Sequence, residues 1–205
     1  LGEKIAITAD KPQTTRNSIR GIYTRKPGTL GKDDEGVQMV FVDTPGIHKS
    51  RNRLGEAMDE MAENTLSEVD LILFLVDEHS MKGHGNDHII EMLQKVKTPK
   101  ILVINKTDQM QPEDYLAIYN QFEDSGMFKE IYGTSALRGD NVEELKQCIE
   151  DQMQEGPMYF PDDMVTDYTE RFLVSEVIRE KALMYLNEEV PHGIAVEVES
   201  FQAER

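Results

Sequence analysis

The stretch ILVINKTD, residues 101–108, joins four consecutive apolar residues directly to four polar ones. A short run that is apolar at every position is typical of a strand buried on both faces, as in a parallel sheet. Three further runs, at residues 37–42, 71–76 and 130–133, are strand candidates, and the run at 71–76 is also apolar throughout. The opening stretch therefore predicts a central strand with a polar cluster at its carboxyl end.

Segments of helical character alternate with these strands, at residues 54–66, 87–96, 112–123 and 142–153. Strands that alternate with helices favour an α/β fold with a doubly wound, mainly parallel sheet. Before residue 37, apolar residues in extended segments and the turn-rich loop KPGTLGKDDEG indicate a β-hairpin arm.

The character of the sequence changes near residue 156. The stretch EGPMYFPDD carries two prolines and two aromatic residues, and predicts a linker that packs on another part of the chain. Asp167 is the expected cap of a following helix, with Glu170 as its capping partner. Ile194, Val196 and Val198 alternate with Glu197 and Glu199, which predicts one half-buried strand. A helix and one strand do not complete a domain, so the second domain is expected to be cut short.

Composition narrows the class of protein. The net charge of −17, from 39 acidic and 22 basic residues, argues against a simple nucleic-acid binder, because phosphate affinity comes mostly from Lys and Arg. No run approaches the ~18 apolar residues of a membrane span. The single cysteine, Cys148, permits no internal disulfide and indicates a reducing compartment, the cytoplasm.

Polar clusters follow three of the predicted strands, where ligands bind in open parallel sheets. They comprise Asp43, Thr44, Pro45 and Gly46, then Asn105, Lys106, Thr107 and Asp108, and then Thr134, Ser135, Ala136 and Leu137. Each cluster alone is also ordinary turn chemistry. Together and in this order they predict a guanine-nucleotide site.

The second cluster carries the selectivity. Guanine presents its N1 hydrogen beside the N2 amine, and the Asp108 carboxylate can accept from both, whereas adenine offers an acceptor at N1. Hydrogen bonds to charged groups contribute about 1.5–3 kcal/mol each, so two of them favour guanine by ~10²–10⁴ fold. Asn105 is expected to hold the base edge and the neighbouring loops, and the Lys106 stem to cover the ring. The amides of Ser135 and Ala136 are candidate donors to the guanine O6.

The first cluster fits the phosphate side of such a site. Asp43 is expected to hold Mg²⁺, through water, and Gly46 to let a backbone amide approach the γ-phosphate. Upstream, Thr15 is the favoured hydroxyl ligand of the metal, with Thr14 as the alternative. Thr15 and Asp43 are therefore the predicted metal ligands, and with Gly46 they are the predicted catalytic residues.

Several motifs resemble the Era family of translation-factor-related bacterial GTPases. They are KPQTTRNSIRGI (residues 11–22), VFVDTPGIHK (40–49), DLILFLVD (70–77), NKTD (105–108) and TSAL (134–137). The segment 156–181 is similar to that family's joint between its GTPase domain and an RNA-binding KH domain. The resemblance covers essentially the whole chain.

The resemblance implies a Ras-like P-loop GTPase domain at residues 1–155, a linker at 156–166 and the start of a type II KH domain at 167–205. It implies Mg²⁺-dependent hydrolysis of GTP to GDP, and a switch that acts on 16S ribosomal RNA during assembly of the small (30S) ribosomal subunit. We expect a cytoplasmic monomer that associates peripherally with the inner face of the cell membrane. Ile47 belongs to the nucleotide-binding set, but it stands where many GTPases have a water-orienting Gln, so intrinsic hydrolysis should be slow.

Two motifs of the family are not found in the chain. The phosphate loop GxxxxGK[ST] has no acceptable match, since residues 28–33 have the wrong spacing, and the GxxG loop of a KH domain does not follow Pro191. We therefore expect a fragment, truncated at both ends, with impaired nucleotide and RNA binding. The alternative is a catalytically inactive GTPase-like scaffold, which would lack a phosphate loop before Leu1 in the parent sequence. A GTPase with two G domains is disfavoured by the segment 156–181.

Overall fold

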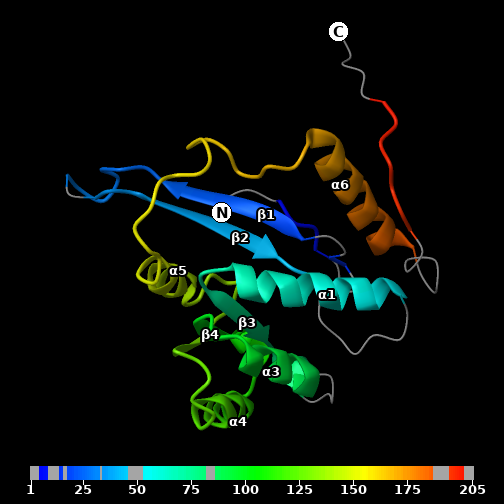
Figure 1. Cartoon of the computed structure of the whole chain (residues 1–205). Coiled ribbons are helices and arrows are strands. Elements are labelled where there is room, and N and C mark those ends of the chain that lie inside the picture. Colours follow the sequence, from blue (N-terminus) through cyan, green and yellow to red (C-terminus); the bar gives the residue numbers. More distant parts are fainter. Residues whose placement is uncertain are drawn as a thin grey trace. The chain divides into compact units, whose positions relative to one another are not determined.

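A computed structural model of the chain describes residues 5–8, 14–15, 18–32, 34–45, 53–81, 86–186 and 194–200. The chain forms two compact units (Figure 1). The first unit combines residues 1–46 with residues 156–205, and the second comprises residues 47–155. Each unit is described by itself.

The second unit contains a parallel sheet of three strands in the order β3-β4-β5. The strands are β3 (Ile72–Val76), β4 (Lys100–Ile104) and β5 (Glu130–Gly133). Its helices are α1 (Arg53–Glu68), α2 (Glu78–Met81), α3 (Asn86–Lys95), α4 (Pro112–Glu123) and α5 (Val142–Glu150), with a 3₁₀ turn η1 (Thr107–Gln109). The predicted parallel sheet and its alternation with helices are therefore confirmed, and the predicted boundaries agree to within a few residues.

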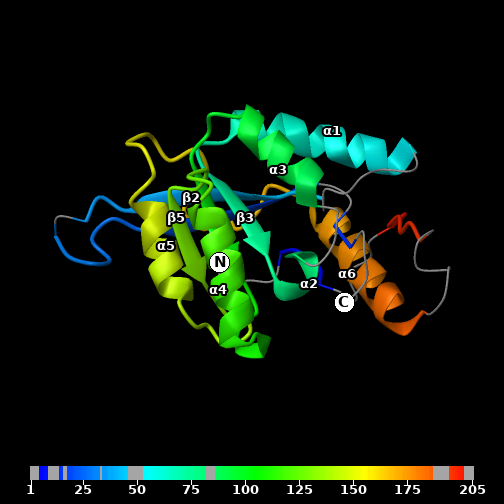
Figure 2. The same cartoon turned by 90° about the horizontal axis from the view of Figure 1, so that it is seen from below.

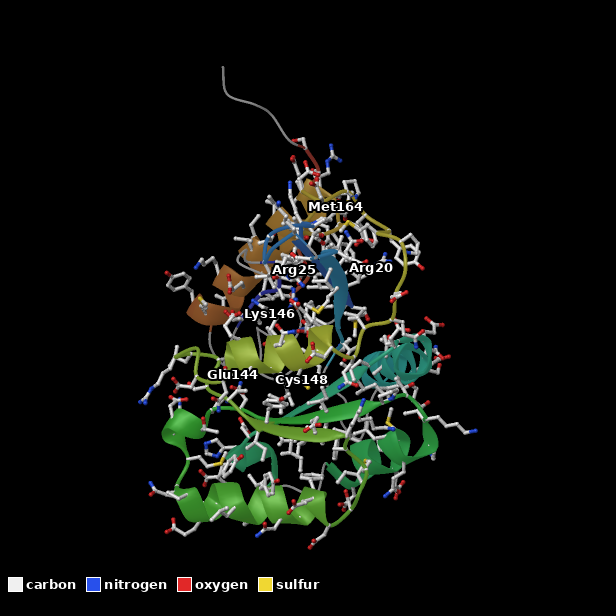
Figure 3. All side chains as sticks on the ribbon, turned by 90° about the vertical axis from the view of Figure 1, so that its left-hand side faces the viewer. Arg20, Arg25, Glu144, Lys146, Cys148 and Met164 are labelled. Atoms are coloured by element: carbon white, nitrogen blue, oxygen red, sulfur yellow. The ribbon has the colours of Figure 1, made fainter. Side chains whose placement is uncertain are left out.

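Strand β4 is buried along its whole length, which explains why residues 101–104 are apolar on both faces, while the ammonium of the buried Lys100 donates to the carbonyls of Val96 and Thr98. On one face, Leu102 and Ile104 pack with Val76 of β3 and with Ile118 and Phe122 of α4. Helix α5 lies against the opposite face (Figures 2 and 3). Burying each of these aliphatic side chains contributes about 1.5–3 kcal/mol, so the sheet is held rigidly beneath the loops at its carboxyl edge.

The first unit contains an antiparallel hairpin of β1 (Ile19–Arg25) and β2 (Val37–Asp43), as predicted. Asp34 organises the connecting loop: its carboxylate accepts from the Arg25 guanidinium and from the amides of Leu30 and Gly36, both at 3.0 Å. Gly36 has a φ of 79°, and a Cβ there would lie 2.7 Å from the Arg25 carbonyl oxygen. Only glycine fits that position without a shift of the backbone.

The segment 156–169 lies along this hairpin, as its composition predicted. The Gln38 side chain accepts from the amides of Tyr159 (2.8 Å) and Phe160 (3.0 Å) and donates to the Phe160 carbonyl (3.0 Å). Further along, the Thr166 hydroxyl donates to the Arg20 carbonyl at 2.7 Å. The aromatic residues of this linker are thus fixed through their backbone.

Helix α6 (Glu170–Tyr185) follows the linker, and its start corrects one prediction. Thr169, not Asp167, caps the helix by accepting from the Phe172 amide at 3.3 Å. Asp167 instead pairs with Arg20, with 2.5 Å between the carboxylate and the guanidinium. A long-range ion pair therefore occupies the carboxylate that local spacing had assigned to the cap.

The predicted strand at residues 194–198 is wrong. Residues 194–200 are described and belong to no strand. An alternating segment becomes a strand only when a neighbouring strand supplies hydrogen bonds, and within the described ranges none pairs with it.

None of the helices in the described part of the chain has the length and apolar character that a bilayer crossing requires.

Candidate functional site

The second unit brings its polar clusters to one edge of the sheet. Val76 is in register with Ile104, and Ile104 with Gly133, so the three strands end at the same level. The residues that follow them are Asp77, Asn105 to Asp108, and Thr134 to Leu137. The NKTD and TSAL clusters are therefore neighbours, as the sequence predicted.

Asp108 lies in η1 with its carboxylate directed into the cluster, and its side chain is only 6% exposed. The Ser135 hydroxyl, itself fully buried, donates to Asp108 Oδ1 at 2.6 Å. This hydrogen bond holds the pKa of Asp108 below its usual range; burial acts in the opposite sense, and the nearby Arg138 guanidinium lowers the pKa further. Asp108 is thus an ionised acceptor with a fixed orientation at neutral pH.

Asn105 joins the NKTD cluster to the TSAL cluster. Its side-chain oxygen accepts from the Ala136 amide at 3.0 Å and from the Thr134 hydroxyl at 3.3 Å. Thr107 strengthens the same connection, because its amide and its hydroxyl both donate to the Thr134 carbonyl, at 3.1 and 3.0 Å. The predicted role of Asn105 in holding neighbouring loops is visible in these contacts.

The backbone amides of the loop after β5 already donate hydrogen bonds within the protein. The Ser135 amide donates to the Asp140 carbonyl at 3.1 Å, and the Ala136 amide donates to Asn105. Donation of either amide to a purine O6, as the sequence predicted, therefore requires exchange or sharing of an existing bond. Leu137, also in the predicted nucleotide-binding set, is 83% exposed beside these residues.

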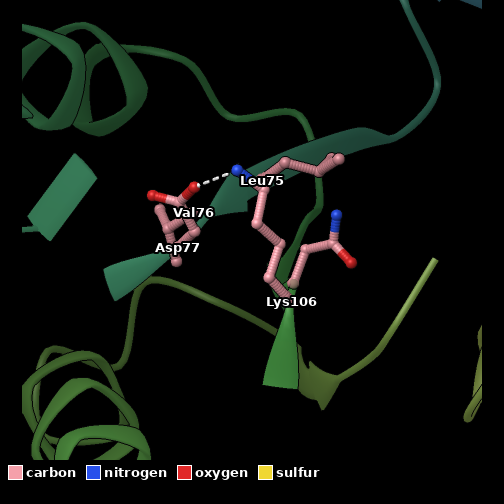
Figure 4. Close-up of a pocket in the computed structure, with 5 residues that line it drawn as sticks. Leu75, Val76, Asp77 and Lys106 are labelled. Carbon is pink, nitrogen blue, oxygen red and sulfur yellow. Dashed lines mark hydrogen bonds and ion pairs between the residues drawn. The ribbon is translucent and has the colours of Figure 1, made fainter. Parts of the chain in front are cut away.

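The side chain of Lys106 contacts the end of β3, whereas those of Asn105, Thr107 and Asp108 contact the loop after β5. Its backbone is left-handed, with φ 64° and ψ 33°, and its ammonium lies 2.8 Å from the Asp77 carboxylate (Figure 4). A small pocket of about 170 Å³ is lined by these two residues with Leu75, Val76 and Asn105. Reasoning from residue chemistry had not assigned Asp77 a role, although an acidic residue directly after an apolar strand is the pattern that singled out Asp43.

The first unit holds the predicted metal ligands together. The Thr15 hydroxyl donates to Asp43 Oδ2 at 3.1 Å, at the end of β2. Burial raises the pKa of Asp43, and the bond from Thr15 partly offsets that rise. Thr44 and Pro45 follow Asp43, and Pro45 is fully buried. Two further predicted residues, Gly46 and Ile47, lie outside the described residues.

Thr14 is held by helix α6. Its carbonyl oxygen accepts from Arg179 Nη2 at 2.6 Å, and Arg179 is paired with Glu176 through Nε at 2.9 Å. The next residue is Glu180, whose carboxylate accepts from the amide and hydroxyl of Thr8, at 3.0 and 3.1 Å. Glu176, Arg179 and Glu180 are buried, so their charged groups interact with these protein partners rather than with water.

The residues present in the first unit fit a magnesium ion. Mg²⁺ prefers oxygen ligands and is usually held by one or two carboxylates plus phosphate oxygens and water. Asp43 supplies a carboxylate that burial leaves short of compensation, and Thr15 supplies a hydroxyl beside it. Within the described ranges there is no cluster of three or more acidic, His or Cys side chains, which would be needed for a metal site built by protein alone.

These features define a class. A covered, hydrogen-bonded carboxylate and its supporting loops lie at the carboxyl edge of a parallel sheet. A family model described as "50S ribosome-binding GTPase" matches residues 1–106. The match places the chain among GTPases with this kind of domain.

Relatives narrow the class further. GTPase Era of Clostridioides difficile (strain 630) is 52% identical over 204 residues, which cover 99% of this chain and 66% of that protein. GTPase Era of Alkaliphilus oremlandii (strain OhILAs) is 51% identical over 197 residues, 96% of this chain and 64% of that protein. The chain therefore belongs to the Era family of GTPases, and it spans just under two thirds of the length of these relatives.

Solved structures agree with this assignment. One, of Era in complex with MgGDPNP and nucleotides 1506–1542 of 16S ribosomal RNA, matches with a TM-score of 0.87 and 35% identity, over 98% of this chain and 65% of that one. Another, of an Aquifex aeolicus Era variant bound to GDP·AlF₄⁻, matches with a TM-score of 0.85 and 34% identity over the same shares. The Ras-like P-loop GTPase fold predicted from the sequence is confirmed.

Proposed function

We propose that the chain is the guanine-nucleotide-binding part of a GTPase that acts as a switch on ribosomal RNA. The observation that carries this proposal is the Asp108 carboxylate, ionised, 94% covered and aimed by Ser135 at the edge of the sheet. A fixed acceptor selects the paired N1 and N2 donors of guanine, and it meets an acceptor on adenine. Supporting bonds from Asn105 and Thr107 remove much of the ordering cost before a base arrives.

The proposed reaction is attack of water on the γ-phosphate of GTP. Bound Mg²⁺ would supply positive charge to the phosphate oxygens. In this chain, Asp43 and Thr15 are the proposed metal-side ligands, and Gly46 the proposed amide donor to the γ-phosphate. Ile47 cannot orient water through a hydrogen bond, so we propose that the intrinsic rate is slow and is raised by another group or partner.

The proposed partner is 16S ribosomal RNA in the small ribosomal subunit. Support comes from the relative of 35% identity whose solved complex contains 16S RNA nucleotides together with MgGDPNP. We propose that residues 167–205 begin a KH-type RNA-binding domain, that residues 1–155 belong to the GTPase domain with residues 156–166 as linker, and that the complete protein works as a monomer in 30S subunit assembly. Peripheral association with the inner face of the cell membrane belongs to the same proposal.

Nucleotide titration tests the guanine assignment. In the complete protein, fluorescent GDP should bind at least ~10² fold more tightly than fluorescent ADP, and Asp108→Asn should lose most of that preference. Asp124→Asn is a matched control, because it removes an exposed carboxylate at the end of α4, away from the edge. Equal affinity of the wild type for both nucleotides would overturn the guanine assignment, and no binding of either would favour the scaffold alternative.

RNA binding is tested separately. The complete protein should bind an RNA with the sequence of 16S nucleotides 1506–1542, the segment present in the solved relative, more tightly with a non-hydrolysable GTP analogue than with GDP. Fluorescence anisotropy at fixed salt measures both affinities. Identical affinities in the two nucleotide states would contradict a switch.

A further inference from the structure

An ion pair lies at the end of β3, next to the NKTD cluster of residues 105–108. Asp77 follows β3 directly, and its carboxylate lies 2.8 Å from the ammonium of Lys106. The two side chains differ in exposure: Asp77 is 19% exposed and Lys106 is 53% exposed. Asp77 is thus mostly buried, whereas about half of the Lys106 side chain remains exposed. Figure 4 shows the Lys106 ammonium directed at the Asp77 carboxylate.

The backbone of Lys106 directs its side chain toward this acid. A left-handed conformation is unfavourable for any residue with a Cβ, so it persists where surrounding contacts impose it. Those contacts flank Lys106: the Asn105 amide donates to the Val76 carbonyl at 2.8 Å, and the Gln109 amide donates to the Lys106 carbonyl at 2.9 Å. The Lys106 side chain therefore projects from the backbone in a fixed direction, beside the end of β3.

The ion pair leaves the two parts of the Lys106 side chain, its ammonium and its methylene stem, in different environments. Asp77 holds the ammonium, and the apolar methylenes between the ammonium and the backbone remain as exposed surface in a restricted position. A free lysine would lose side-chain freedom when a purine packs on its stem. A lysine already anchored at its end has lost that freedom before the base binds, which favours the complex.

Stability alone is a poor reason for this contact. Ion pairs with one exposed partner contribute little to folding. The location is more informative, because Asn105, which separates Lys106 from β4, is the residue whose side chain connects to Ala136. Asp77 therefore acts on the one member of the NKTD cluster that the loop after β5 does not hold.

We propose that Asp77 is a positioning residue of the nucleotide site, which anchors Lys106 so that its stem forms a preset wall for the guanine ring. The inference rests on the proposed function, since it assigns Asp77 a part in holding the same base. Asp77 itself does not touch the base. Its effect should be seen in how long the nucleotide stays bound, because loss of preorganisation and contact acts mostly on dissociation.

Displacement of fluorescent GDP from the complete protein by excess unlabelled GDP measures this residence time. Asp77→Asn should raise the dissociation rate about tenfold, the loss expected from one charge-assisted contact, and Asp77→Glu should recover most of the wild-type rate. Lys106→Met, which keeps a stem but cannot pair, should also raise the rate. Lys106→Arg, which can still pair with Asp77, should dissociate more slowly than Lys106→Met. Asp124→Asn is again the control.

A double variant separates positioning from a general structural role. Asp77→Asn combined with Lys106→Met should dissociate no faster than Lys106→Met alone, because the proposed effect of Asp77 on the nucleotide passes through the Lys106 ammonium. Multiplicative effects of the two changes, or a rate for Asp77→Asn within twofold of wild type, would overturn the inference. If Asp77→Asn does not fold, the contrast between Lys106→Met and Lys106→Arg decides: equal rates for these two would overturn it.

The outcome is distinguishable from failure of the proposed function. The same preparations are titrated with fluorescent ADP. A wild type that prefers GDP but shows no effect of Asp77→Asn refutes the positioning role alone. A wild type without preference for GDP refutes the guanine assignment itself.

Discussion

Two groups of predicted site residues are held in different ways. One is the base-side cluster of the second unit, which comprises residues 105–108 and 134–137, and the other is the Thr15–Asp43 pair of the first unit. In the cluster, the bonds from Ser135 to Asp108 and from Ala136 to Asn105 join loops that follow neighbouring parallel strands. The Thr15–Asp43 pair lies at a hairpin end, and the carbonyl of the preceding Thr14 is held by Arg179, 165 positions away.

This difference indicates what each region needs in order to form. The base-side cluster is assembled by the sheet beneath it, so its geometry follows from strand register. The Thr14 carbonyl is held by a buried ion pair of α6, within residues 167–205, which we propose begin an RNA-binding domain. Changes in α6 should therefore affect the Thr15 segment and the stability of the first unit, and leave guanine selection intact.

The largest expected effect is that of Arg179→Ala. It leaves the carboxylate of Glu176 buried without its partner, so the free energy of unfolding should fall by about 3–5 kcal/mol. Replacing both residues by Met should recover most of that loss, because no buried charge remains. Urea unfolding measures both changes. A loss below 1 kcal/mol for Arg179→Ala would break the proposed dependence on α6, as would a changed GDP-to-ADP affinity ratio in the folded variant.

The next effect concerns the opposite side of the comparison. Ser135→Ala removes the donor to Asp108, so GDP affinity should fall about tenfold or more. It also removes the main cause of the lowered Asp108 pKa, so on acidification GDP binding should be lost at higher pH than in wild type. Ser125→Ala, which alters a loop serine after α4, is the control. An unchanged acid limit would contradict the role given to Ser135.

A smaller effect is expected at Thr15. Thr15→Val removes the hydroxyl that donates to Asp43, so the already raised pKa of Asp43 should rise further. The Mg²⁺ concentration needed to support nucleotide binding should increase about threefold. Thr15→Ser should behave as wild type. A magnesium titration of nucleotide affinity provides the measurement. Equal magnesium dependence in Thr15→Val and wild type would remove Thr15 from the proposed metal side.

Asp43 also predicts a direction for stability against pH. Because burial raises its pKa, the native chain keeps this proton to a higher pH than the unfolded chain does. Its contribution to the free energy of unfolding should therefore decrease as the pH rises above the usual 3.8 and through the raised pKa. Asp43→Asn should flatten that part of the profile. A profile unchanged by the substitution would show that Asp43 titrates alike in both states.

The smallest effect is expected at Asp34. The Arg25 guanidinium, together with the amides of Leu30 and Gly36, lowers the pKa of Asp34 from 3.8 to about 2. Its stabilising contribution should be complete above pH 3.8 and lost as the pH falls toward about 2. Asp34→Asn should weaken this acid-dependent part, whereas Glu35→Gln, the same charge change on an exposed neighbour in the loop, should not. Identical acid unfolding of the two variants would contradict the anchoring role.

The sequence predicted most of what the sheet determines. Apolar runs located β3, β4 and β5, and the rule for parallel strand ends brought Asn105, Asp108 and Ser135 together. Local spacing could not reveal contacts between distant segments. Asp167 had the spacing of a helix cap, but its carboxylate is used by Arg20, and Thr169 caps instead.

The same limit applies to residues whose partners are not local. Arg179 and Glu180 read as ordinary polar positions of a helix, and only the fold shows them buried against Thr14 and Thr8. Residues 194–198 alternate like a strand, yet alternation does not supply the neighbour that a strand needs. Lys106 was expected to cover a base, and only the structure shows its left-handed backbone and the ion pair that joins its ammonium to Asp77.

The most direct test of the account is the affinity of the complete protein for GDP and for xanthosine diphosphate, in wild type and in Asp108→Asn. Xanthine keeps the N1 hydrogen but carries a carbonyl oxygen where guanine has its amine. An amide at position 108 can accept from N1 and donate to that oxygen, as a carboxylate cannot. We expect a GDP preference in wild type and a reversed preference in Asp108→Asn. A variant that still prefers GDP, or a wild type that binds both equally, would contradict it.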